Sequence, residues 1–159
     1  MNKQKLLEQI LSELTEKYES LCLAARATYD GATHEDSKAE GKYDTRSLEA
    51  SYLAGAQAKR VSEVEESISR YESMKIREFS FDDPVALGAL VKLESDSKSS
   101  FYFIGPDAGG MNLQLEGEMV TVITPKSPLG QSLIGKKIDD EVEVRSGNSK
   151  RFFNIIEIF

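Results

Sequence analysis

The stretch THEDSKAEGKYD, residues 33–44, stands between two long helical patterns. It carries four carboxylates, at Glu35, Asp36, Glu40 and Asp44. Like charges on one short turn repel each other, so a turn needs a reason to hold so many. Two interpretations stay open at this point: a solvated polar loop, or an acidic tip that two helices present to a partner.

The residues on either side of this acidic tip follow a heptad pattern. From Lys3 to about Tyr29, apolar or small side chains recur at alternating steps of four and three, at Leu7, Leu11, Leu14, Tyr18, Leu21, Ala25 and Thr28. From about Thr45 to Lys75 the pattern repeats at Ala50, Ala54, Gln57, Val61, Val64, Ile68 and Tyr71. Two such seams joined by a short turn predict an antiparallel coiled-coil hairpin over residues 1–75. Half of a larger helical bundle would show the same seams, but no third seam follows.

The period of the sequence changes at residues 76–84, which we interpret as a linker. Asp82-Asp83-Pro84 ends helical structure, because the residue before a proline avoids the helical region. Beyond it apolar residues alternate, first from Leu87 to Leu93 on one face, as in strands. We expect one short helix between Pro128 and Gly135 and strands at 85–93, 100–104, 111–115, 119–124, 141–145 and 151–159. The predicted fold class is therefore α+β, with the hairpin followed by a small antiparallel sheet domain with one helix over residues 85–159.

The composition argues against several classes of protein. The chain has 159 residues and a net charge of −7, which argues against direct wrapping of nucleic acid, because Lys and Arg supply that affinity. No apolar run approaches the roughly 18 residues of a membrane span, and the N-terminus has no signal-peptide core. Cys22 is the single cysteine, so neither a disulfide framework nor a cysteine zinc site is expected. We therefore expect a cytoplasmic protein without membrane contact.

Few residues suggest catalysis by the chain alone. His34 is the single histidine, and no further His or Cys is available beside it to complete a zinc site. Gly130, Gly135 and Lys136 have phosphate-loop spacing, but Lys137 stands where such a loop needs Ser or Thr, and a strand follows in place of a helix. Carboxylates suit magnesium, which takes few protein ligands and keeps waters and substrate phosphates. The tip is thus a candidate half of a magnesium site that a partner completes.

Residues 123–144, ITPKSPLGQSLIGKKIDDEVEV, resemble the C-terminal part of the Gre family of bacterial transcript cleavage factors. The shared order is a strand, Ser-Pro, a short helix, Leu-Ile-Gly-Lys, Asp-Asp and a Val-rich strand. The N-terminal hairpin with its tip is similar to the same family. Placing the family's tip Tyr on Tyr43 puts its Asp on Asp36 and its Lys on Lys38. The family's Glu, three residues after the Asp, falls on Ala39, with Glu40 one place further.

The resemblance implies a bacterial transcription elongation factor whose partner is RNA polymerase. The C-terminal domain would have an FKBP-like fold without that enzyme's activity. It would dock at the rim of the polymerase secondary channel through Ser127, Pro128 and Leu129, and the hairpin would enter the channel. The chain would be a monomer, would meet nascent RNA only indirectly, and would not be an enzyme itself.

The resemblance also gives the acidic tip a role in RNA cleavage. Asp36, paired with Glu40 or Glu35, would help to hold the second Mg²⁺ of the polymerase active site, and Lys38 and Tyr43 would support the tip. Backtracked RNA would then be cut by two-metal hydrolysis, with no cofactor belonging to this chain. Two other functions stay open: a channel regulator of the same shape that does not stimulate cleavage, and a coiled-coil adaptor between proteins.

Overall fold

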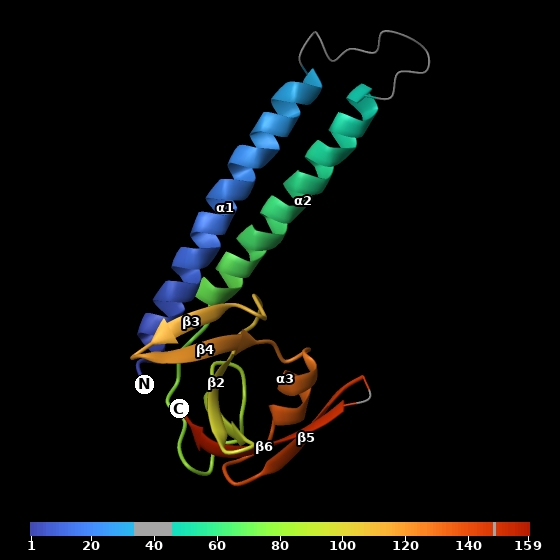
Figure 1. Ribbon diagram of the computed structural model, residues 1–159. Helices are drawn as coiled ribbons and strands as arrows, with labels where there is room; N and C mark the ends of the chain where they lie inside the picture. The colour runs from blue at the N-terminus through green and yellow to red at the C-terminus, as the bar shows by residue number, and fades with distance from the viewer. Residues whose placement is uncertain (34–45, 148) are drawn as a thin grey trace. The chain divides into compact units, whose positions relative to one another are not determined.

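The predicted helical hairpin is confirmed in the computed structural model, which describes residues 1–33, 46–147 and 149–159. Helix α1 spans Lys3–Thr33 and helix α2 spans Arg46–Glu72, and the two run side by side (Figure 1). The seam positions from Leu7 to Thr28 and from Ala54 to Tyr71 are all buried or half-buried. Polar side chains such as Glu13 take the exposed positions between them, as a heptad pattern predicts.

Helix α1 is longer than the sequence suggested. The pair Asp30-Gly31 predicts the end of a helix, yet α1 continues through it to Thr33. A glycine inside a helix costs only about 1 kcal/mol. The thirty-one-residue helix tolerates that cost, so the turn signal alone did not mark its end.

By their contacts, the residues form two compact units: 11–69, and 1–10 together with 70–159. The first ten residues and the last turn of α2 therefore group with the sheet, whereas the period change placed the predicted linker at 76–84. That the hairpin and the sheet domain fold separately stays a prediction.

The sheet of the second unit has six strands in the order β3-β4-β2-β1-β6-β5. The elements are β1 (Leu90–Ser95), β2 (Lys98–Ile104), β3 (Asn112–Leu115), β4 (Glu118–Ile123), α3 (Pro128–Leu133), β5 (Glu141–Ser146) and β6 (Ser149–Ile158). The sheet is mixed, where an antiparallel one was predicted, because β4 pairs with β2 in parallel. The physical reason is the β3–β4 hairpin, which places β3 at the edge and turns β4 back beside β2.

The first strand also begins later than the alternation indicated. Residues 86–89 form a turn in which the Ala89 amide donates to the Ala86 carbonyl, and Gly88 takes a positive φ of 84°. Leu87, expected on the buried face, is instead 45% exposed. The apolar alternation before Leu90 therefore does not mark a strand.

The main core lies between the sheet and α3, which rests against one face of it (Figure 1). Its centre consists mainly of apolar residues of the strands together with Leu133 of α3, all of them buried. Tyr102, Leu129 and Phe153 pack at its margin and stay half-buried. The candidate functional site lies at the margin of this core.

The ends of both long helices are fixed within the sheet-containing unit. Tyr71 is fully buried, and its hydroxyl donates to the Asp107 carbonyl at 2.7 Å, while Arg70 pairs with the Asp107 carboxylate at 2.7 Å. A Cβ at Gly105 would lie 2.2 Å from the Tyr71 hydroxyl, so only glycine fits there. On α1, Lys3 is buried and its ammonium donates to the Arg77 carbonyl. These contacts attach the helix ends to the loops around residues 77 and 107.

Candidate functional site

The start of α3 is organised by Ser127, the residue before its first turn. The Ser127 hydroxyl accepts a hydrogen bond from the Gly130 amide at 3.1 Å and donates one to the Thr124 carbonyl at 2.8 Å. Pro128 follows as the first helical residue, where its missing N–H costs nothing. Both functions of the hydroxyl are used inside the chain. Ser127 therefore fixes the shape of this surface.

Gly130 explains why the turn before α3 is so tight. A Cβ there would lie 2.0 Å from the Thr124 carbonyl oxygen, so any other residue would push the turn apart. Leu133, one turn later, is fully buried in the core. With the buried side of the helix fixed by these two residues, Pro128 is left exposed and Leu129 half-buried. The structure thus brings the three predicted docking residues together on one accessible surface.

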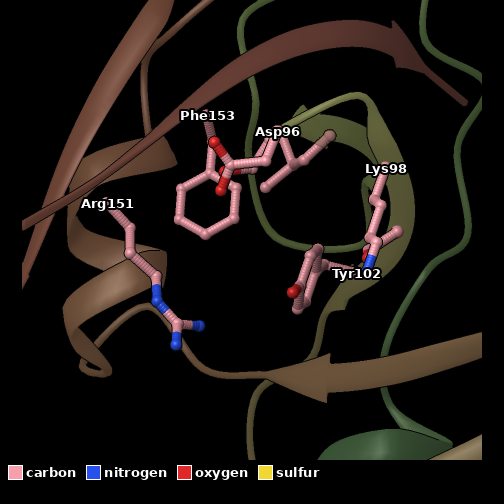
Figure 2. Close-up of a pocket in the computed structure, with 8 residues that line it drawn as sticks. Asp96, Lys98, Tyr102, Arg151 and Phe153 are labelled. Atoms are coloured by element: carbon pink, nitrogen blue, oxygen red, sulfur yellow. The ribbon is translucent and has the colours of Figure 1, made fainter.

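Beside this surface lies a groove that sequence reasoning missed. It consists of two adjoining hollows of about 340 and 360 Å³ that share Tyr102, Arg151 and Phe153, and the second hollow reaches Leu129. Figure 2 shows the Phe153 and Tyr102 rings bounding the first hollow, with the Arg151 side chain extending beside them. A signal was available: Arg151 and Phe153 are two apart on one strand, so they share a face.

The two faces of the β5–β6 pair differ in their charge pairing. On the face away from the groove, Glu143 pairs with Arg145 at 2.6 Å and with Lys150 at 3.3 Å. The hydrogen bond from Arg145 is the first cause that lowers the pKa of the Glu143 carboxyl. On the groove face, the Arg151 side chain forms no ion pair with any residue in 1–33, 46–147 or 149–159.

The predicted tip residues lie outside the described part of the chain. These are Glu35, Asp36, Lys38, Glu40 and Tyr43. Within the described ranges, no group of three or more His, Cys, Asp or Glu side chains could hold a metal ion. The magnesium role of the tip therefore stays a prediction.

Two further sequence expectations concern the described helices. Cys22 is half-buried and unbonded to another cysteine, next to the seam residue Leu21. No helix in the described ranges is both long and apolar enough to cross a bilayer.

Comparison with known proteins identifies the family. Residues 81–159 match the family model "Transcription elongation factor, GreA/GreB, C-term". The transcription elongation factor GreA of Rhodospirillum rubrum is 27% identical over 133 residues, which cover 82% of this chain and 77% of that protein. The GreA of Pelagibacter ubique is 27% identical over 155 residues, covering 96% of this chain and 90% of that protein.

Solved structures of similar chains carry related names. The structure of the transcription factor Gfh1 covers 93% of this chain and 92% of its own, with 17% identity and a TM-score of 0.40. The Gfh1 protein of Thermus thermophilus covers 98% and 93%, with 21% identity and a TM-score of 0.39.

A helical hairpin followed by a mixed sheet domain with one short helix defines a Gre-type transcription elongation factor, and the family model matches the sheet domain, residues 81–159. The chain belongs to the GreA/GreB family, and the predicted family is confirmed. The proteins that the family model and the relatives describe are transcription elongation factors.

Proposed function

We propose that this chain binds RNA polymerase in its secondary channel and stimulates cleavage of backtracked RNA through the acidic tip. Family membership together with the hairpin carries the proposal. Two helices of 31 and 27 residues lead to and from a stretch with four carboxylates. At 1.5 Å per residue, such helices are about 40–47 Å long. A hairpin of that length could place the tip carboxylates inside a channel while the sheet domain stays outside it.

The proposed role of the tip follows from the chemistry of phosphodiester hydrolysis. Two metal ions lower the barrier when one activates the attacking water and the other stabilises the leaving oxygen. RNA polymerase would supply the tightly held ion. Asp36, with Glu40 or Glu35, would steady the second Mg²⁺ through carboxylate oxygens, which are the ligands that this ion prefers. Lys38 and Tyr43 would support the tip.

The proposed docking surface is the start of α3. Pro128 is exposed and Leu129 half-buried, so both offer apolar area to a partner. The bonds of Ser127 hold this turn in one shape before binding, which saves the entropy of ordering it in the complex.

The test is an assay with stalled, backtracked elongation complexes, in which shortened RNA is the readout. Asp36→Ala is expected to leave polymerase binding nearly intact and to slow cleavage about tenfold or more, at least about 1.4 kcal/mol of barrier. Glu40→Ala should behave alike if Glu40 pairs with Asp36. Glu19→Ala is the matched control, because it removes an exposed carboxylate from the shaft of α1.

One residue favours a second candidate, a channel regulator that does not stimulate cleavage. Ala39 stands where the family has the Glu that partners Asp36. Wild-type protein that binds polymerase and never shortens backtracked RNA at any magnesium concentration would establish this second function. Ala39→Glu, which restores the family spacing, should then switch cleavage on. Absence of any polymerase binding would instead favour the coiled-coil adaptor.

A further inference from the structure

The groove beside α3 has an apolar floor that the chain leaves half open. Tyr102 of β2 and Phe153 of β6 pack at the margin of the core, and the rest of each ring faces the groove. Leu129 of α3 and Val144 of β5 continue this apolar lining in the second hollow. Covering a half-exposed aromatic surface of this kind with a partner's apolar side chain stabilises the complex.

The same groove carries an arginine that no other part of the described chain pairs with. Arg151 stands opposite Val144 in the β5–β6 register, so both side chains lie on the groove face. Asp96, from the turn between β1 and β2, and Lys98, the first residue of β2, line the far end. The groove thus has two cations and one acid, in a chain whose net charge is −7. An arginine fork binds a carboxylate through two parallel hydrogen bonds.

The groove is continuous with the proposed docking surface. Leu129 belongs to both, because it follows Pro128 at the start of α3 and also lines the second hollow. A partner that covers Pro128 and Leu129 is therefore brought to the groove as well. We propose that the groove receives a segment of RNA polymerase with an acidic side chain next to an apolar one. Arg151 binds the carboxylate, and the Tyr102 and Phe153 rings cover the apolar neighbour.

This inference rests on the proposed polymerase docking and adds the chemistry of the segment that is recognised. The aromatic lining selects a peptide over a free anion, since a free anion would leave the rings uncovered. Nucleic acid is a poor occupant, because Asp96 and the overall negative charge repel phosphates.

The test is an equilibrium titration of labelled full-length protein with core RNA polymerase, repeated over a series of salt concentrations. Arg151→Glu is expected to weaken binding about tenfold or more at low salt and to flatten the salt dependence, because a charge-assisted contact is lost. Arg151→Lys keeps the charge but loses the second hydrogen bond of the fork, so its affinity should fall between those of wild type and Arg151→Glu. The matched control is Arg145→Glu, which reverses an exposed arginine on the opposite face of the same strand pair.

The outcomes separate this inference from the function on which it rests. If wild-type protein does not bind polymerase, the proposed docking fails, and the groove loses its partner with it. If wild type binds and Arg151→Glu binds equally well, the groove is not part of the interface, while docking through α3 stands. Equal losses for Arg151→Glu and Arg145→Glu would show a general charge effect and would also overturn the inference. Thermal unfolding of each variant checks that the sheet domain is intact.

Discussion

At the scale of single residues, Tyr71 shows how the end of α2 is held. Its ring is fully buried, its hydroxyl donates to the Asp107 carbonyl, and Gly105 leaves just enough space for it. We expect Tyr71→Phe to lower the free energy of unfolding by about 1–2 kcal/mol, because a buried acceptor loses its donor. Urea unfolding followed by circular dichroism measures this loss. Tyr52→Phe, at a 72% exposed position, is the control and should change stability little.

The stabilising effect of the Tyr71 hydroxyl should depend on pH. Burial, reinforced by the nearby Asp107 carboxylate, raises the pKa of Tyr71 above its usual value near 10. As the pH rises through about 10, the unfolded chain loses this proton first, so the native state binds more protons and stability falls with pH. The contribution is therefore fully present below about pH 10 and is lost above it. The stability difference between wild type and Tyr71→Phe should shrink between pH 9 and pH 11, roughly. A constant difference over this range would contradict the assignment.

At the scale of elements, docking through α3 can be tested by a double change. Pro128→Ala with Leu129→Asp removes the apolar area at the helix start and should weaken polymerase binding, with an unchanged circular dichroism spectrum. Leu129 also packs at the core margin, so the thermal midpoint must be measured alongside. Ile134→Asp, a 41% exposed residue at the other end of α3, is the control. Unchanged binding by the double variant would remove this surface from the interface.

The sequence was informative about elements wherever one side of an element is buried. Heptad spacing predicted α1 and α2, and Pro128 with Gly135 predicted α3. Sequence-based prediction was wrong where local residue patterns do not determine the secondary structure or the strand pairing. Alternation around Leu87 looked like a strand, although Gly88 turns the chain there. Parallel pairing of β2 with β4 depends on the path of the intervening chain, which no local pattern encodes.

The candidate site was predictable only in part, for a related reason. Ser127 and Pro128 carry a local signal, because capping depends on neighbouring residues. The groove joins Tyr102 of β2 with Arg151 and Phe153 of β6, which meet only through the pairing of β1 with both strands. Those residues are ordinary strand residues in the sequence. Three-dimensional pairing is what makes them a site.

At the scale of the whole molecule, the two units should be separable. We expect a chain in which a short Gly-Ser linker replaces residues 11–69 to fold cooperatively, because 1–10 and 70–159 form one compact unit. A fragment of residues 85–159 should be less stable, since it lacks the buried Leu6, Ile10 and Tyr71. Thermal unfolding and amide NMR spectra of the two proteins provide the comparison. Loss of cooperative folding in the linker protein would mean that the hairpin and the sheet domain fold only together.

The attachment of Arg70 and Tyr71 to Asp107 also restricts how the hairpin can change its length in evolution. Each residue inserted into α2 turns the helix by about 100°, so a single insertion would rotate the seam out of phase with that attachment. An insertion of seven residues nearly completes two turns, so it keeps the seam of α2 in phase with the attachment. Helix α1 must then gain seven residues as well, because its seam faces that of α2. The length of the hairpin is therefore adjustable in steps of about 10 Å, and not continuously.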